Sequence, residues 1–212
     1  MPKPSRKRLF QFDLKFDREA VAITIVSTLL LMVDYYERLT PYKVLDRVAL
    51  YLIIPLLVII FVFRKPLRDY GFTFGDWRAG LALTAIVILI AAPILWFTAH
   101  NDRSMMDYYA SQWGPAAPLF TFLDLIGWEF FFRGFLLFGF ARVFGANALW
   151  LQAVPFALAH LGKPAVETYS TIFGGFLFGL VAWRARSFVY PFLIHWFIST
   201  FTIFAAASAA LR

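Results

Sequence analysis

The chain has 212 residues, of which 61% are hydrophobic and only 16% are charged, and its mean hydropathy is +0.69. These values exclude a disordered chain, a coiled coil and a typical soluble globule, since soluble domains carry about 25% charged residues. Cysteine is absent, which excludes disulfides, thiolate metal sites and cysteine nucleophiles. The net charge of +7 comes from basic residues between apolar blocks, where orientation in a lipid bilayer explains them better than nucleic-acid binding does.

The N-terminal residues 1–19 are rich in Lys and Arg and are followed by an apolar block of spanning length. This pattern does not match a secretory signal peptide, because the block lacks a cleavage-like end. We expect a basic cytoplasmic arm that lies on anionic lipid, with a frayed basic tail as the alternative.

A membrane-spanning helix needs about 20 mostly apolar residues, and seven blocks meet or approach this requirement. They are residues 20–33, 47–63, 79–98, 117–141, 146–161, 168–184 and 188–208. The sequence therefore predicts an all-α, multi-pass membrane bundle of about seven helices, with residues 20–212 as a single transmembrane domain. The sixth block is rich in glycine, which predicts a close approach of another helix.

The basic residues between the blocks predict the orientation. Most of the 20 Lys and Arg residues fall on one side of the membrane when the N-terminus is placed inside. Because cytoplasmic loops carry an excess of Lys and Arg, we expect a multi-pass cell-membrane protein with a cytoplasmic N-terminus.

Four ionisable residues lie within the apolar blocks, where each is costly unless it is paired. Glu129 and Arg133 belong to the fourth block, His160 ends the fifth and His195 lies in the seventh. The third histidine, His100, falls in a polar stretch that predicts a loop. The first three blocks hold no such charge away from their ends, so we expect the four residues to meet around one polar cavity.

Spacing leaves simpler interpretations open. Glu129 and Arg133 are four residues apart and can form a purely structural ion pair on one helix face, and a lone membrane histidine is often only a helix contact. Glu167 follows a Gly- and Pro-containing turn after His160. That turn can fold Glu167 back over the cavity, or leave it as a solvated loop acid beside Lys163.

These residue types suit hydrolysis by an activated water molecule. A carboxylate in an apolar pocket near Arg or His can act as a general base, so Glu129 is predicted to take a proton from water with help from His160. His195, with Ser199 one turn later, is predicted to stabilise the oxyanion. A covalent route is less favoured, because no serine lies in a nucleophile-elbow context.

No cofactor is expected. The alternative is a catalytic zinc ion held by Glu129, His160 and His195, because two His and one Glu form a known zinc ligand set. The H-E-x-x-H spacing of many zinc proteases is absent, so three separate helices would have to supply the ligands.

The residues WEFFFRG at 128–134, Phe156–Ala–Leu–Ala–His160 and His195–x–x–x–Ser199 occur in the order seen in the CPBP family (CAAX proteases and bacteriocin-processing enzymes, or Abi family). The chain resembles this family of intramembrane endopeptidases over about residues 120–205. In the family the blocks read E-E-x-x-x-R, F-x-x-x-H and H-x-x-x-N or H-x-x-x-D. The resemblance implies a peptide hydrolase whose catalytic core occupies this part of the chain.

Two positions depart from the family pattern. Counting back from Arg133, the first Glu of the pair falls on Trp128, and only Glu129 is acidic. The first Glu usually has the water-activating role in the family, so Glu129 takes over that role here or the activity is altered. Glu167 is a candidate for the second carboxylate. Ser199 replaces the usual Asn or Asp, with a hydroxyl that has a shorter reach.

The favoured hypothesis is an intramembrane endopeptidase acting on a membrane-anchored protein or peptide that can carry a lipid. Glu129, His160, His195, Arg133, Glu167 and Ser199 are its predicted catalytic residues. A second hypothesis is a catalytically degenerate membrane scaffold or immunity-type protein, for which Trp128 would mark a lost site. A third is a proton-coupled transporter, which the absence of repeated halves argues against.

Overall fold

The computed structural model describes residues 14–211, and all regular structure in that range is helical. Most of the predicted arm at residues 1–19 lies outside the described residues. The elements are α1 (Arg18–Tyr36), α2 (Lys43–Arg47), η2 (Val48–Ile53), α3 (Ile54–Leu57), η3 (Val58–Phe63), η4 (Leu67–Tyr70), α4 (Trp77–Asn101), α5 (Arg103–Ala110), α6 (Ala117–Glu129), η5 (Phe130–Leu136), α7 (Leu137–Phe144), η6 (Gly145–Asn147), α8 (Ala148–Leu158), α9 (Ala165–Ala185) and α10 (Val189–Ala210).

Six helical stretches within the described residues are long and apolar enough to cross a membrane. One of them, Ala117–Leu158, has 42 residues and holds two passes, because η6 lets α8 pack back against α7. Gly145 in this turn has φ +55°, a left-handed conformation that glycine adopts at little cost. The chain therefore crosses the bundle seven times, as the sequence predicts, and the protein is a multi-pass membrane protein.

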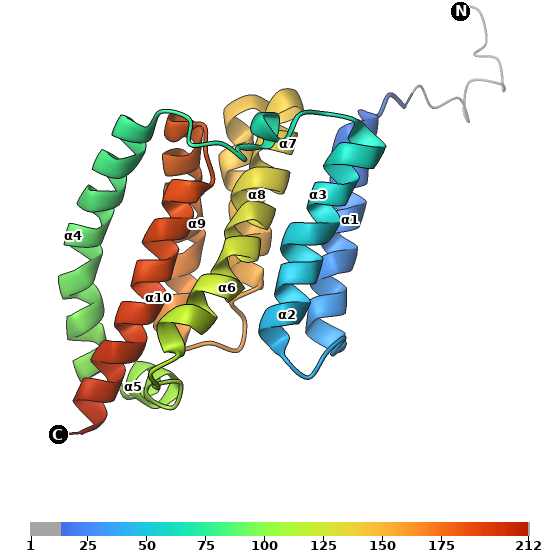
Figure 1. Ribbon diagram of the computed structural model, residues 1–212. Helices are drawn as coiled ribbons and strands as arrows, with labels where there is room; N and C mark the ends of the chain where they lie inside the picture. Colours follow the sequence, from blue (N-terminus) through green and yellow to red (C-terminus); the bar gives the residue numbers. More distant parts are fainter. Residues whose placement is uncertain (1–13, 212) are drawn as a thin grey trace, which may run out of the picture.

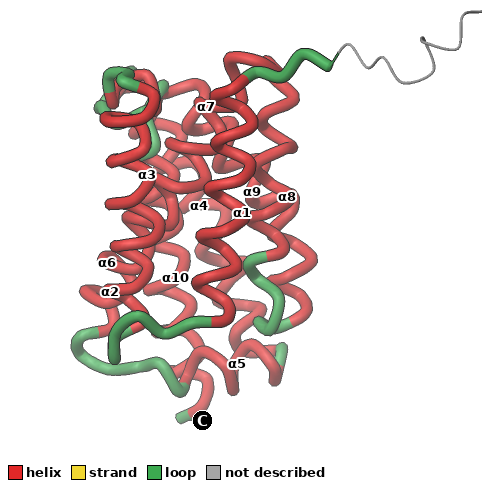
Figure 2. Tube along the Cα trace, turned by 90° about the vertical axis from the view of Figure 1, so that its right-hand side faces the viewer, coloured by secondary structure: helices red, strands yellow, loops and turns green. Residues whose placement is uncertain are grey.

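The helices run roughly parallel and form a bundle (Figures 1 and 2). In Figure 1, α1 begins at the upper end and α10 ends at the lower end, so the two ends of the described chain lie on opposite sides. The α6–η5 segment lies between the pair α1 and α3 and the group α4, α9 and α10. This central position places its side chains within reach of both groups of helices.

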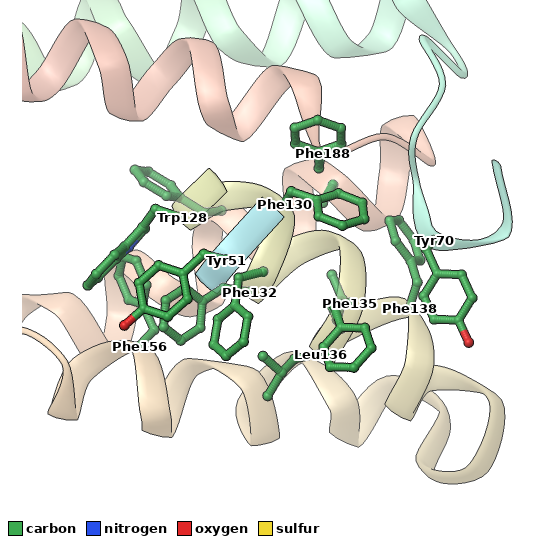
Figure 3. Packing of buried hydrophobic residues seen from close by; sticks show 14 of the residues in the cluster. Tyr51, Tyr70, Trp128, Phe130, Phe132, Phe135, Leu136, Phe138, Phe156 and Phe188 are labelled. Carbon is green, nitrogen blue, oxygen red and sulfur yellow. The ribbon is translucent and has the colours of Figure 1, made fainter. Parts of the chain in front are cut away.

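The segment Phe130–Leu136 is the most buried part of the bundle, since every residue of it is buried. It forms a π-helix, a wider turn that often occurs at functional sites. Aromatic rings surround it (Figure 3). The ring centroid of Tyr51 of η2 lies 4.7 Å from that of Phe131. Because lipid tails are as apolar as these side chains, close packing rather than water exclusion holds them together.

Helices α8 and α9 approach closely, as the glycine-rich block predicts. A Cβ atom at Gly175 would lie 2.9 Å from a ring carbon of Phe156, and one at Gly179 would lie 2.8 Å from the amide nitrogen of Gln152. These two glycines therefore let the backbone of α9 reach the side chains of α8.

The prediction that His100 lies in a loop is wrong. Helix α4 continues through Asn101, and the short helix α5 follows almost at once. The carboxylate of Asp102 accepts a hydrogen bond of 3.0 Å from the backbone N–H of Met105, which caps the start of α5. The polar stretch around His100 therefore contains the end of α4 and the start of α5 rather than a loop.

Candidate active site

Glu129 occupies the last position of α6 and is fully buried. Its Oε1 atom accepts hydrogen bonds from Nη1 of Arg133 at 3.2 Å and from Nδ1 of His195 at 2.6 Å. Its Oε2 atom is buried and has no protein partner among the described residues. The acid is thus held by two side chains from η5 and α10 and keeps one oxygen unused.

Arg133 is also fully buried and lies among aromatic rings. Its guanidinium carbon lies 3.9 Å from the ring centroid of Phe156 and 5.2 Å from that of Phe178, close enough for cation–π attraction. Its Nη2 atom donates to the backbone oxygen of Gly175 at 3.4 Å. The predicted i, i+4 ion pair therefore forms, and α8 and α9 enclose it.

Gln152 is a buried polar residue that sequence reasoning missed. Its side-chain amide donates to the backbone oxygens of Leu149 and Gly175, both at 2.8 Å. Gly175 is the same residue whose carbonyl accepts from Arg133. A glutamine inside an apolar block was the available signal, since an unpaired amide there is costly.

The two late histidines come together, with ring centroids 6.4 Å apart. His160 lies in the turn after α8, and its Nδ1 is 2.7 Å from the backbone oxygen of Phe156. Because that oxygen only accepts, Nδ1 carries the proton and Nε2 keeps its lone pair. Burial, followed by the positive charge of Lys163, lowers the pKa of His160, so this imidazole is neutral at neutral pH.

His195 has the same tautomer for a different reason. The Glu129 carboxylate, which also pairs with Arg133, is the acceptor of the bond to Nδ1. In the neutral imidazole, the hydrogen on Nδ1 leaves the lone pair on Nε2, as in a Ser-His-Asp triad. Both histidines therefore offer a basic nitrogen that is not used by its anchoring contact.

Both imidazoles line a cavity of about 760 Å³ with mostly apolar walls from α4, α9 and α10. Ser199 lines the same cavity one turn after His195. Glu129 and Arg133 are not among its lining residues and are reached through His195. The structure thus brings five of the predicted residues to one place, with the acid–arginine pair behind the imidazoles.

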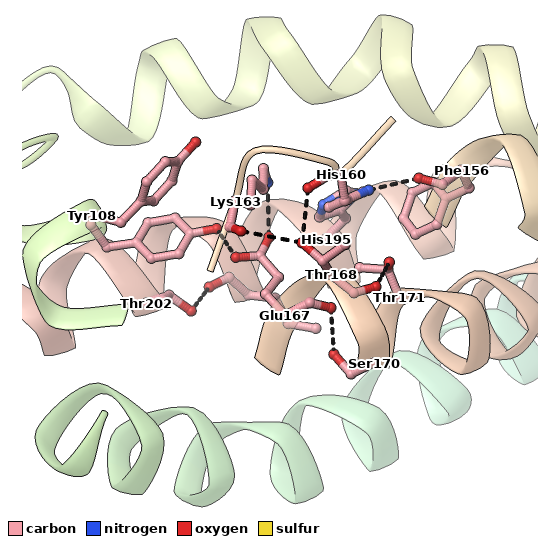
Figure 4. A network of polar contacts seen from close by, with 12 residues as sticks. Tyr108, Phe156, His160, Lys163, Glu167, Thr168, Ser170, Thr171, His195 and Thr202 are labelled. Atoms are coloured by element: carbon pink, nitrogen blue, oxygen red, sulfur yellow. Dashed lines mark hydrogen bonds and ion pairs between the residues drawn. The ribbon is translucent and has the colours of Figure 1, made fainter. Parts of the chain in front are cut away.

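Glu167 lines this cavity as well, but both of its oxygens are engaged. Oε1 is 2.8 Å from Nζ of Lys163 (Figure 4). Oε2 accepts a hydrogen bond of 2.5 Å from the hydroxyl of Tyr109. The turn after His160 therefore does fold Glu167 toward the cavity. The structure ties it to Tyr109 of α5, a partner that the sequence did not suggest.

Trp128, which stands where the family pattern has its first Glu, is buried beside His160. Their ring centroids are 5.7 Å apart in an edge-to-face arrangement. The guanidinium of Arg47 lies over this indole, with its central carbon 4.9 Å from the ring centroid. An aromatic wall thus replaces a carboxylate next to the imidazole.

The residues of the alternative zinc site are Glu129, His160 and His195. Within residues 14–211, no group of three or more His, Asp or Glu side chains is placed to hold a metal ion. Oε1 of Glu129 pairs with the cation of Arg133 and with His195, whereas Oε2 has no protein partner among the described residues.

Fold and site together define a multi-pass membrane protein with a buried acid–imidazole centre. The family model for the Rce1-like type II CAAX prenyl endopeptidases matches residues 85–201, which is more than half of the chain. The chain belongs to this family, and the family assignment made from the sequence motifs is confirmed. No curated protein and no solved structure matches the chain.

The matched range begins within α4 and ends within α10. It includes the short helix α5 and every predicted site residue, namely Glu129, Arg133, His160, Glu167, His195 and Ser199. The family implies a protein or peptide substrate.

Proposed function

We propose that the protein is an intramembrane endopeptidase that hydrolyses a peptide bond of a membrane-associated protein or peptide with an activated water molecule. The observation that carries this proposal is the 2.6 Å contact between Glu129 and His195 behind a cavity that both histidines line. A buried carboxylate, an imidazole and a cavity are the parts that general-base hydrolysis needs.

The contact favours a different division of roles from the one the sequence suggested. Glu129 orients His195 and stabilises its protonated form, and Nε2 of His195 takes the proton from water as the water oxygen attacks the carbonyl carbon. His160 holds the same water through its own Nε2. The hydroxyl of Ser199 donates a hydrogen bond to the oxyanion.

The reaction needs no reactant other than the substrate and water. The tetrahedral intermediate collapses as the C–N bond breaks, and the proton on Nε2 of His195 passes to the leaving amine nitrogen. The first products are a carboxylic acid and an amine, which exchange a proton to give a carboxylate and an ammonium group, and the histidine is neutral again. Arg133 compensates the charge of Glu129 throughout, because the two remain paired at 3.2 Å.

The apolar cavity supports a membrane-embedded substrate, with or without an attached lipid. Its walls come largely from aliphatic residues of α4 and α9, such as Leu83, Ile90 and Leu177. A soluble peptide would gain little from such walls, whereas a substrate already in the bilayer presents apolar surface to them.

The N-terminus is proposed to be cytoplasmic. Because the chain has no cysteine, single cysteines can be introduced for labelling. A membrane-impermeant thiol reagent on intact cells should label Ser111→Cys, in the segment between α5 and α6, and not Thr73→Cys, in the segment before α4. The reverse pattern would overturn the orientation.

The test of the function starts from membrane proteomes of cells with and without the gene, which identify a membrane protein that remains uncleaved without it. Purified protein in detergent should cleave that substrate, with and without a metal chelator. A variant in which Glu129, His160 and His195 are all alanine should not. No cleavage by the wild type, or equal cleavage by the triple variant, would contradict the proposal, and chelator sensitivity would restore the metal alternative.

The scaffold hypothesis keeps one observation in its favour, which is Trp128 at the position of the first family Glu. Its test uses the same triple variant in cells that lack the gene. Equal rescue by the wild type and the triple variant at matched expression would favour a binding role.

A further inference from the structure

The short helix α5 lies at the end of the bundle near the C-terminal end of α10 (Figures 1 and 2). Its Tyr109 is buried, and it shares a separate apolar cluster with Ile203 and Ala206 of α10. Helix α10 also carries His195. Tyr109 is therefore fixed to the helix that holds one of the two imidazoles.

The hydroxyl of Tyr109 reaches across to α9, where it donates to Oε2 of Glu167 at 2.5 Å. Burial and the nearby Glu167 charge raise the pKa of Tyr109 far above its ordinary value, so the hydroxyl stays protonated and remains a donor. Lys163 holds the other oxygen of Glu167 at 2.8 Å. Each carboxylate oxygen of Glu167 thus has a strong partner of its own.

The turn held in this way carries the other imidazole. The backbone oxygen of His160 accepts from the backbone N–H of Lys163 at 3.1 Å and from the hydroxyl of Thr168 at 2.9 Å (Figure 4). Glu167 lies between these two donors in the chain, in the first turn of α9. A movement of that turn is therefore transmitted directly to the backbone of His160.

We propose that Glu167 and Tyr109 are positioning residues that fix His160 relative to His195. Tyr109 packs against α10, the helix that carries His195. Its hydrogen bond to Glu167 fixes the start of α9 and therefore the turn that carries His160. On this proposal Glu167 acts through its contacts with Tyr109 and Lys163 rather than as a second catalytic carboxylate. This inference deepens the proposed function and rests on it for its effect on rate.

The structural part of the test does not depend on activity. The chain has three histidines, so ¹⁵N-labelled histidine gives three imidazole environments in an NMR spectrum, with His100 as the internal reference. Tyr109→Phe and Glu167→Gln should each shift the signals of His160 and leave those of His100 in place. The matched control is Tyr108→Phe, which removes the neighbouring hydroxyl. Unchanged His160 signals in both variants would overturn the proposal.

The kinetic part uses a substrate cleaved by the wild type. Tyr109→Phe and Glu167→Gln should each lower kcat by about tenfold to 100-fold, the range expected when a reacting group is misplaced by about 1 Å, with KM nearly unchanged. The double variant should be no worse than the poorer single variant, because both break one contact. Additive losses, or a Glu167→Gln variant as inactive as Glu129→Gln, would overturn the positioning role.

The two parts separate the two proposals. If the wild type cleaves nothing, the proposed function fails, while the His160 signals still decide whether Tyr109 and Glu167 position that imidazole. If the wild type cleaves and the His160 signals do not move, the positioning role fails and the proposed function stands.

Discussion

Two acids of the central helix α6 each pair with an arginine, but the two pairs have very different surroundings. Asp124 pairs with Arg47 of α2 at 2.6 Å, and their side chains are 21% and 25% exposed. Glu129 pairs with Arg133 at 3.2 Å, and both side chains are 0% exposed. The two acids are five residues apart, about 140° around a helix, so they face different neighbours.

The difference shows what separates a structural pair from a candidate site. Arg47 also lies near Asp34 at 3.7 Å, and within residues 14–211 no imidazole hydrogen-bonds to Asp124 or Arg47. Glu129 adds His195 at 2.6 Å and lies behind a large cavity. An ion pair alone is weak evidence of function, whereas a buried pair that orients an imidazole toward a cavity is a specific arrangement.

A third acid–arginine pair is more exposed to solvent than the other two. Asp76 caps α4 and pairs with Arg184 of α9 at 2.7 Å, with side chains that are 42% and 61% exposed. The three pairs thus form a series from fully buried to largely exposed. The loss of stability on removing a charge should decline along this series.

The largest effect on stability is expected at Arg133. Arg133→Met removes one partner of a fully buried pair and leaves the Glu129 charge without compensation, which typically costs about 3–5 kcal/mol. Thermal unfolding in detergent measures this loss. The double variant Glu129→Gln/Arg133→Met removes both charges and should recover a large part of it. A double variant that is less stable than Arg133→Met would contradict the pairing.

The next effect is expected on the cleavage rate when either of the two site histidines is removed. His195→Ala and His160→Ala should each reduce the cleavage rate at least ~100-fold, the contribution typical of a general acid–base group. His100→Ala is the matched control, because His100 bonds only to the backbone oxygen of Trp96 within the described residues. A rate unchanged by either of the first two variants would remove that histidine from the mechanism.

A smaller effect is expected at the half-buried pair. Asp124→Asn removes a charge that Arg47 shares with Asp34, so the remaining acid still compensates the guanidinium. We expect a loss of about 1 kcal/mol or less, as for other partly solvated pairs. A loss as large as that of Arg133→Met would show that the contribution of these pairs to stability does not follow their burial.

The smallest effect is expected at Asp76 and depends on pH. The backbone N–H of Ala79 and the guanidinium of Arg184 lower the pKa of Asp76 below its ordinary value of 3.8. A lowered pKa stabilises the folded state fully above that ordinary value, and the contribution disappears as the pH falls through the lower folded value. Unfolding midpoints measured from about pH 6 to about pH 2 should therefore fall slightly less in Asp76→Asn than in the wild type. Parallel curves would contradict this.

Hydropathy and spacing predicted much of the molecule. Apolar blocks placed seven passes, and the i, i+4 spacing placed Arg133 on Glu129. The cost of ionisable groups in lipid also singled out His160 and His195, which do line one cavity. These features follow from local rules, because each depends on a single helix or on the bilayer as solvent.

Side-chain contacts between helices that are far apart in the sequence could not be predicted from it. The bond from His195 to Glu129 joins residues 66 positions apart, and helical periodicity does not set the rotation of α10 against α6. Tyr109 was missed as a partner of Glu167 because α5 is a short helix in a polar stretch. Which oxygen or ring nitrogen is free depends on such contacts, so the division of roles had to come from the structure.

The measurement that tests the account most directly is the single-turnover cleavage rate of two matched variants on one membrane-embedded substrate. Glu129→Gln and Asp124→Asn each remove one carboxylate charge from the same helix. The account predicts a loss of at least ~100-fold for Glu129→Gln and a rate close to that of the wild type for Asp124→Asn. Equal rates for the two variants would contradict it.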